Sequence, residues 1–171
     1  MADVRENNRD FTLLFLVMLI TGAGNTALQS VLPTLGRTIG VADSVIAAAF
    51  SVSAAIWVFT APRWARRSDR DGRREMVMLG LVGFISSVGL CGIVLTLGLL
   101  KVLGPLVTMV AFIAARMLYG FFGAAAPPAA QAMVALRTSR KDRTKALTML
   151  GSAFGLGTIL GPAAAPWLVG M

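Results

Sequence analysis

Residues 65–74 read Ala-Arg-Arg-Ser-Asp-Arg-Asp-Gly-Arg-Arg and lie between two long apolar runs. The run upstream, residues 44–61, and the run downstream, residues 76–100, contain no charged side chain. A helix rises about 1.5 Å per residue, so roughly 20 apolar residues cross the hydrocarbon core of a bilayer. The charged stretch can lie only in water, whereas its flanks suit lipid. These residues therefore predict two membrane-spanning helices that are joined at one surface of the membrane.

The composition of the whole chain supports a membrane protein. Of its 171 residues, 56% are hydrophobic and 14% are charged, whereas a soluble domain usually has about 25% charged residues. The net charge of +8 would suit a nucleic-acid partner. The basic residues, however, cluster in short connections between apolar runs and do not spread along an exposed face with aromatic residues. The pattern excludes nucleic acid and indicates the lipid bilayer as a partner.

The apolar runs predict an all-α integral membrane protein with five transmembrane helices. Residues 1–10 are polar and are predicted to form an N-terminal tail, with Asp10 as the N-cap of the first helix. The sequence favours a membrane span over a cleaved signal peptide here, because the first apolar run is too long and ends in no clean small-x-small site. Buried helices of a soluble protein are excluded by the length of every run. The five helices are predicted at about residues 11–35, 44–62, 76–100, 106–136 and 146–170.

The distribution of Lys and Arg predicts the orientation. The N-terminal tail has two, the connection after the second helix has six, and the connection after the fourth helix has five. The connections after the first and third helices have one each, Arg37 and Lys101. Cytoplasmic loops carry the excess of basic residues. Thirteen Lys and Arg residues therefore lie on one side of the membrane and two on the other. This difference predicts a multi-pass protein of the plasma (inner) membrane. Its N-terminus and both basic connections are predicted in the cytoplasm, and Met171 on the outer side.

Residues suited to enzyme chemistry are scarce. The chain has no His, which is the commonest general base and metal ligand. Cys91 is alone within an apolar run, so no disulfide framework or metal set is expected. The spans contain no paired carboxylates and no nucleotide-binding loop. We therefore expect no cofactor, no metal and no enzymatic activity.

Arg116 is the only charged residue within a predicted span. It lies about ten residues, or roughly 15 Å, from the outer end of the fourth helix, which is deep for a side chain that reaches back to the interface. At 100° per residue, Gly120, Gly123, Pro127 and Gln131 share its helix face. This face has the composition of a cavity wall or of a close helix contact. We therefore expect Arg116 and Gln131 to face a wet cavity or a polar partner.

Polar and small residues also recur in the first and fifth helices. Thr21, Asn25 and Gln29 form a polar stripe with a four-residue repeat. This stripe either forms hydrogen bonds between helices or lines a substrate cavity. In the fifth helix, Gly157 and Gly161 are followed by Pro162, which removes a helical hydrogen bond. These residues predict either a packed helix pair or a bent hinge.

The charged stretch itself has three interpretations. Its arginines could set the topology, or they could bind anionic lipid. The order Asp69-Arg70-Asp71-Gly72-Arg73-Arg74 also predicts a turn in which Gly72 has a positive φ and carboxylates lie at the start of the next helix.

This order of residues resembles the cytoplasmic loop motif of the major facilitator superfamily, which lies between the second and third helices. Two further motifs resemble the same family in the expected order. Arg116-x3-Gly120 resembles its fourth-helix motif, and Gly157-x3-Gly161-Pro162 resembles the fifth-helix motif of its drug/proton antiporter branch.

The resemblance implies that residues 11–171 belong to the N-terminal half of a transporter, as part of a six-helix bundle of a major facilitator fold. The family has about twelve helices in two related halves with the substrate at their interface, so the chain is expected to be a fragment that lacks the C-terminal half. The implied function is transport of a small organic solute by alternating access. More specifically, the resemblance implies proton-coupled efflux of drug-like compounds. The alternative is a non-transporting five-helix scaffold or oligomeric subunit.

The resemblance also implies roles for individual residues. Asp69 would join a latch between the two halves on the cytoplasmic side, supported by Arg70, Arg73 and Arg74. Arg116 would influence proton movement.

In the fifth helix, Gly157, Gly161 and Pro162 would limit leak. The first helix departs from many drug/proton antiporters because its polar residues are neutral.

Overall fold

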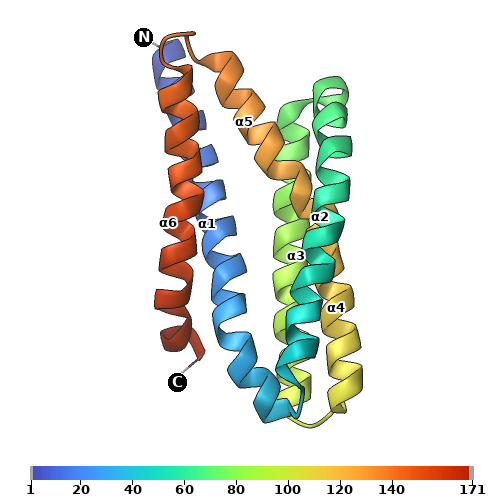
Figure 1. Cartoon of the computed structure of the whole chain (residues 1–171). Coiled ribbons are helices and arrows are strands. Elements are labelled where there is room, and N and C mark those ends of the chain that lie inside the picture. Colours follow the sequence, from blue (N-terminus) through green and yellow to red (C-terminus); the bar gives the residue numbers. More distant parts are fainter. Residues whose placement is uncertain (1, 170–171) are drawn as a thin grey trace.

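The computed structural model describes residues 2–169, with side chains for residues 9–167, and the regular secondary structure of this part is helical throughout, with short connections between the helices (Figure 1). Five helices within it are long and apolar enough to cross a membrane, one of them formed jointly by α4, η1 and α5. The prediction of an all-α protein with five spans is confirmed. In order, the elements are α1 (Ala2–Ile39), α2 (Asp43–Asp71), α3 (Arg73–Leu99), α4 (Pro105–Phe122), the 3₁₀ turn η1 (Gly123–Ala125), α5 (Ala126–Arg137) and α6 (Arg143–Val169).

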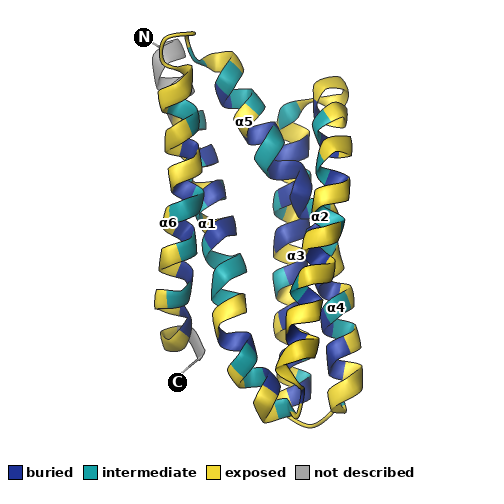
Figure 2. Ribbon diagram, viewed as in Figure 1, coloured by how far each residue is buried: buried dark blue, intermediate teal, exposed yellow. Residues whose placement is uncertain are grey.

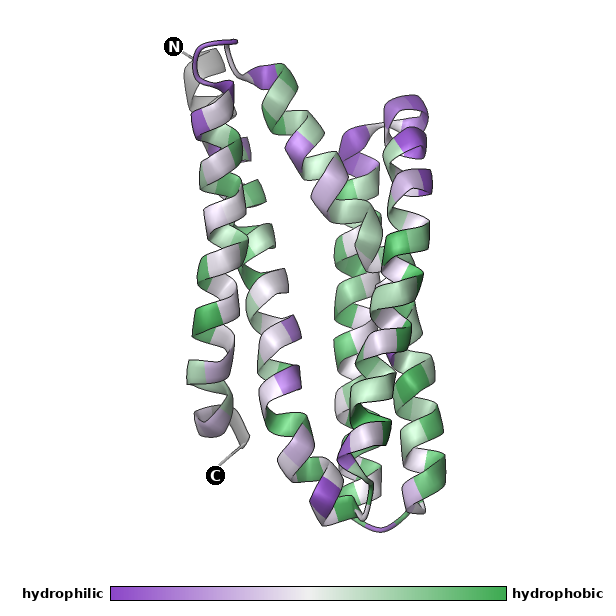
Figure 3. Ribbon diagram, in the orientation of Figure 1, coloured by the Kyte–Doolittle hydropathy of each residue, from purple (hydrophilic) through white to green (hydrophobic). Residues whose placement is uncertain are grey.

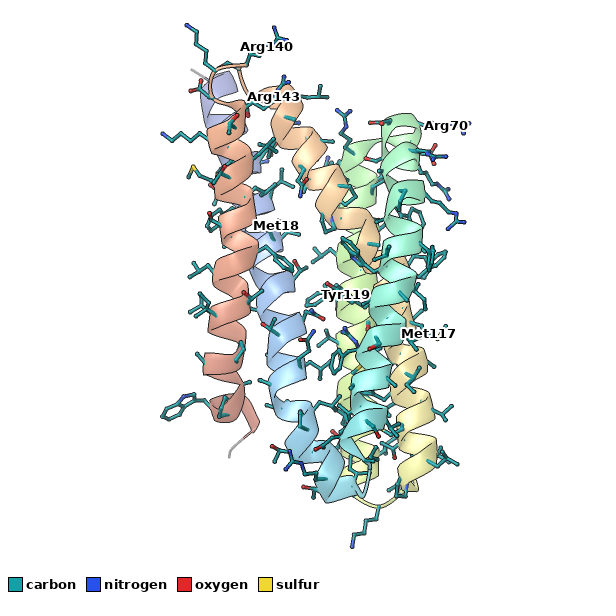
Figure 4. The ribbon with its side chains drawn as sticks, in the orientation of Figure 1. Met18, Arg70, Met117, Tyr119, Arg140 and Arg143 are labelled. Carbon is teal, nitrogen blue, oxygen red and sulfur yellow. The ribbon has the colours of Figure 1, made fainter. Side chains whose placement is uncertain are left out.

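Successive spans run in opposite directions, so the two ends of the chain lie at opposite ends of the bundle (Figure 1). Hydrophilic residues concentrate at the ends of the bundle, and hydrophobic residues occupy most of its length (Figure 3). Arg70, Arg140 and Arg143 lie at the same end as the N-terminus (Figure 4). The two basic connections therefore share one end of the molecule.

The first helix begins earlier than the sequence predicted. Helix α1 starts at Ala2, so Asp10 lies inside it and the prediction that Asp10 is an N-cap is wrong. The carboxylate of Asp10 instead accepts a hydrogen bond from the guanidinium of Arg137 at the end of α5. This ion pair joins two distant segments at the basic end of the bundle.

The charged stretch 65–74 is almost entirely helical. Helix α2 continues to Asp71, and α3 begins at Arg73. Only Gly72 interrupts them, with φ of 108°, which confirms the predicted positive φ and favours glycine because it has no Cβ. The predicted position of the carboxylates at the start of the next helix is wrong: Asp69 and Asp71 lie in the last turn of α2, where each forms an ion pair with an arginine four residues away.

The spans pack as two groups. Helices α1 and α6 form a pair, and α2, α3 and α4 form the other group, with α5 bridging toward α1 and α6 (Figure 1). Two apolar clusters fill the interior (Figure 2). One, at the basic end, includes Leu14, Trp64 and Ala124. The other, toward the opposite end, includes Leu32 and Phe112. The first four spans each contribute to both clusters, and polar side chains occupy the layer between them, whereas α6 contributes only to the cluster at the basic end.

Glycines allow the backbones of α1 and α6 to meet. A Cβ added at Gly157 would collide with the carbonyl oxygen of Leu19, and one added at Gly161 would collide with that of Ala23. Gly22 of α1 faces α6 in the same way, with its added Cβ only 2.6 Å from the carbonyl oxygen of Phe154. The interpretation of these glycines as a packed helix pair is therefore realised, and α6 continues as a helix through Pro162.

The contact between α1 and α6 can be tested with two alanine variants. Gly157→Ala places a methyl group against the backbone of α1, and overpacking of this kind typically costs about 1–3 kcal/mol. We expect the purified protein in detergent to melt several degrees lower than wild type. Gly155→Ala is the matched control, because a Cβ there meets no atom within 4 Å, while it gains the same helix propensity of about 1 kcal/mol. Equal melting temperatures for the two variants would contradict this packing.

Candidate functional site

The guanidinium of Arg116 lies in the polar layer between the two apolar clusters. Only 2% of this residue is exposed. Its Nη2 donates a hydrogen bond of 2.9 Å to Oδ1 of Asn25 in α1. Its Nε and Nη1 are buried and have no hydrogen-bond partner among the described residues. Arg116 therefore has a polar partner and does not reach back to the membrane surface.

Two aromatic rings hold the guanidinium in place. The Cζ atom of Arg116 lies 4.8 Å from the ring centroid of Phe50 in α2 and 4.8 Å from that of Tyr119 in α4. The side chain of Tyr119 extends from α4 toward α1 (Figure 4). Such cation–π contacts are worth about 2 kcal/mol or more when they are desolvated. They offset part of the cost of burying a charge in this layer.

Hydroxyl groups from two helices fix the α4 backbone beside this arginine. Ser53 of α2 donates a 3.0 Å hydrogen bond to the carbonyl oxygen of Arg116. Ser87 of α3 donates a 2.8 Å hydrogen bond to the carbonyl oxygen of Ala115. One turn later, Thr60 of α2 donates to the carbonyl oxygen of Gly120. The position of Arg116 is thus determined by α2 and α3 as well as by its own helix.

A cavity of about 600 Å³ opens beside the guanidinium, a size in the range of sites for small organic molecules. Four aromatic rings and three side-chain amides border it, and Arg116 is the one charged side chain in the described lining. The lining residues are Met18, Asn25, Gln29, Phe50, Ser51, Ser53, Ala54, Trp57, Val58, Arg116, Tyr119, Pro127, Gln131, Gly151 and Phe154.

The structure brings together most of the polar residues that the sequence singled out. Asn25, Gln29, Arg116 and Gln131 all line the cavity, from α1, α4 and α5. Thr21 is buried and does not line it, because its hydroxyl donates to carbonyl oxygens of its own helix, at 2.8 Å to Val17.

The small residues on the same face of the fourth span have other surroundings. Pro127 lines the cavity. Gly120 instead packs against the backbone of Ser53, and Gly123 packs against the ring of Tyr119. The face predicted from a uniform helix is therefore divided between a cavity wall and a helix contact, since the 3₁₀ turn at η1 changes the rotation per residue.

The residues of the charged stretch lie away from this cavity, at the basic end of the bundle. Asp69 accepts a 3.0 Å hydrogen bond from Nη2 of Arg73 across the turn at Gly72. Nε of Arg73 and Oγ of Ser68 are buried without a partner among the described residues. Arg70 points away from the end of α2 (Figure 4). This end therefore presents two exposed aspartates, Asp69 and Asp71, within a largely basic surface.

The aromatic lining was not identified from the sequence. Phe50, Trp57, Tyr119 and Phe154 border the cavity, but an aromatic residue in a membrane span is equally compatible with a position that faces lipid. The spacing of Phe50, Ser53 and Trp57 is a helical one and could have indicated a shared face. It could not have indicated that this face turns inward.

Two smaller cavities, of about 290 and 410 Å³, lie beside α1 at the basic end. Both include the ion pair between Asp10 and Arg137, whose charges compensate each other. The cavity beside Arg116 is larger, at about 600 Å³, and the one charged side chain of its described lining is buried among the spans. We therefore take it as the candidate functional site.

Comparison with known proteins agrees with this architecture. The profile of the Major Facilitator Superfamily matches residues 14–171. The chain belongs to the major facilitator superfamily. It is 30% identical over 170 residues to multidrug resistance protein 2 of Bacillus subtilis, and 32% identical over 159 residues to the class B tetracycline resistance protein of Escherichia coli. The resemblance inferred from the three motifs, including its drug-transporter branch, is confirmed.

These alignments cover almost all of this chain but a smaller part of its relatives. The chain is aligned over 98% of its own length with the first relative and 91% with the second, and it spans 39% and 36% of those proteins. Family membership makes this a multi-pass membrane protein of a transporter family and not an enzyme, as the sequence predicted.

The hydroxyl groups that hold α4 can be tested together. The double change of Ser53→Ala and Ser87→Ala removes two interhelical hydrogen bonds, each worth roughly 0.6 kcal/mol in a membrane bundle. We expect a melting temperature in detergent lower by about 2–4 °C, close to the sum of the single changes. Ser51→Ala is the control, because that hydroxyl binds a carbonyl oxygen of its own helix. A loss in the control as large as in the double variant would contradict this anchoring.

Proposed function

We propose that this chain is the N-terminal part of a secondary transporter that exports small, drug-like organic molecules in exchange for protons. The observation that carries the proposal is a buried arginine with free donors at the wall of a cavity lined by amides and aromatic rings. A scaffold of packed helices would have no need to bury such a charge, which costs at least about 2.5–3.5 kcal/mol. The names of the relatives, multidrug and tetracycline resistance proteins, support the class of substrate.

The partial coverage of these relatives supports a second half beyond this chain. Transporters of this architecture place the substrate between two related bundles that rock around it. The cavity beside Arg116 would then be one wall of the substrate site, with Asn25, Gln29 and Gln131 as its hydrogen-bonding groups. The missing C-terminal half would supply the opposite wall.

The orientation follows from the basic residues. Because both basic connections share the end of the molecule at which the N-terminus lies, we propose that this end faces the cytoplasm in the plasma (inner) membrane. The cavity would then open to the two sides of the membrane in turn as the halves rock.

Arg116 is the proposed link between substrate and protons. A fixed positive charge favours the ionised form of an acid nearby, so Arg116 would promote the release of a proton from a carboxyl group that approaches it. The described lining contains no carboxylate. The proton-carrying acid is therefore proposed to lie in the other half of the transporter.

The residues of the charged stretch are proposed to form a cytoplasmic latch. Asp69, whose side chain is 64% exposed, would bind the other half when the cytoplasmic side closes. Arg70, Arg73 and Arg74 would support it and contact anionic headgroups, while Gly72 holds the turn between α2 and α3.

The glycines of α6 have a related proposed role. Close packing of Gly157 and Gly161 on α1, with Pro162 in the same segment, would limit leak along this pair of helices during the rocking motion.

The role of Arg116 can be tested by substitution in the complete transporter. Arg116→Ala removes the charge, and we expect proton-driven efflux in inverted membrane vesicles to fall at least about tenfold, equivalent to 1.4 kcal/mol. Arg116→Lys keeps the charge but loses the planar fork, so partial activity is expected. Membrane abundance is measured in parallel. Full activity of the alanine variant at normal abundance would contradict the role.

The latch can be tested with two neighbouring aspartates. Asp69→Asn and Asp71→Asn each remove one exposed ion pair with an arginine four residues away, which is worth only about 0.3–0.5 kcal/mol. Stability should therefore change little in both. Transport should be strongly impaired only by Asp69→Asn, measured as the initial rate in the same vesicles. Equal transport rates in the two variants would remove the latch assignment.

A further inference from the structure

The guanidinium of Arg116 has donors to spare. Of its five N–H groups, the three on Nε and Nη1 have no partner among the described residues. Phe50 and Tyr119 lie against it, each 4.8 Å from Cζ to the ring centroid, and Asn25 occupies one donor of Nη2. The stacked rings and this hydrogen bond hold the guanidinium, and with it the positive charge, in one orientation beside the cavity.

The surroundings of this fork are neutral. Asn25, Gln29 and Gln131 contribute amides, and Arg116 is the one charge in the described lining. A buried cation without a counter-ion is costly, and a bound anion would supply the missing charge. A ligand cation would be repelled by the same group. The charge of the cavity thus favours an anionic ligand with oxygen acceptors.

Aromatic residues border the remaining space. Trp57 of α2 and Phe154 of α6 line the cavity together with Phe50 and Tyr119. Aromatic rings prefer edge-to-face or offset contacts with other rings. An aromatic ligand could therefore pack among these side chains while its acidic group lies at the arginine.

We infer that this cavity binds aromatic organic anions, with the carboxylate or a similar oxyanion of the ligand lying against the guanidinium of Arg116. The inference rests on the proposed function, since it names the class of substrate for the same cavity. It makes this chain's wall of the transporter selective against lipophilic cations. Charge-assisted hydrogen bonds of arginine to a carboxylate are roughly twice as strong as neutral ones, so charge dominates this preference.

Three probes of one shape test the inference: 2-naphthoate, neutral 2-naphthamide and 2-naphthylmethylammonium. Binding to the complete purified transporter is measured by titration calorimetry at neutral pH. Naphthoate should bind about tenfold or more tightly than naphthamide, and the ammonium compound should not compete with it. Equal affinity for the acid and the amide, or no binding of naphthoate, would overturn the inference.

Substitutions then place the binding at this arginine. Arg116→Gln should abolish the preference for naphthoate and leave the affinity for naphthamide within about threefold. Arg63→Gln is the matched control, because it removes the same charge from an exposed side chain outside the cavity lining. An unchanged preference in the Arg116 variant would overturn the assignment.

The partner of Arg116 provides an independent variant. Asn25 lies within hydrogen-bonding distance of the guanidinium, so Asn25→Asp places an internal carboxylate on it. Naphthoate affinity should fall about tenfold or more, because the internal anion competes for the same donors. Competition by the ammonium compound should appear as the cavity charge is neutralised. Unchanged naphthoate binding in this folded variant would overturn the inference.

Transport separates this inference from the proposed function. If vesicles show proton-driven export of a lipophilic cation and the protein does not bind naphthoate, the transporter proposal stands and the anion inference falls. If naphthoate binds through Arg116 but no probe is transported, the anion site stands and the transport proposal falls.

Discussion

A charged guanidinium in the middle of an apolar bundle is the constraint on which the rest of this structure depends. Lipid offers no hydrogen bonds and no counter-ions, so the protein must supply the surroundings of Arg116 itself. It does so with Asn25 from α1 and with rings from α2 and α4. The polar layer lies between two apolar clusters, which shield it from both ends of the bundle. Two nitrogens of the guanidinium, Nε and Nη1, are left without a hydrogen-bond partner among the described residues.

The two groups of helices are held together by different interactions. In the α1–α6 pair, glycines let one backbone approach the carbonyl oxygens of the other. Between α2, α3 and α4, side-chain donors reach carbonyl oxygens of the fourth span, as Ser53, Ser87 and Trp64 do. Neither the glycine contacts nor these hydrogen bonds depend on the hydrophobic effect, which is weak between helices in lipid. The cavity is bordered by both groups, so movement between them would change its shape.

Some features of the site were readable from the sequence because they are costly in a membrane. An arginine and three amides in apolar spans, Arg116, Asn25, Gln29 and Gln131, must turn inward to be satisfied, and all four line the cavity. Thr21 follows the same four-residue repeat, yet its hydroxyl donates a hydrogen bond to a carbonyl oxygen of its own helix. Its polarity alone therefore did not show whether it lines the cavity. The ends of the first two helices were also misjudged. Both helices extend beyond the apolar runs into the charged segments. Charged residues in these extensions form ion pairs, such as those of Asp10 and Asp71.

The sequence by itself determined the number of spans, the glycine turn at Gly72 and the family, because run length, positive φ and ordered motifs are local properties of a chain. Only the tertiary structure decided which aromatic residues enclose Arg116, and that Gly157 meets α1 while Gly155 meets nothing within 4 Å. The physical reason is that aromatic and small apolar side chains suit both lipid and the protein interior, so their positions in the sequence do not mark the inner face of a span. Packing against neighbouring helices selects that face, and with it the shape and charge of the cavity beside Arg116.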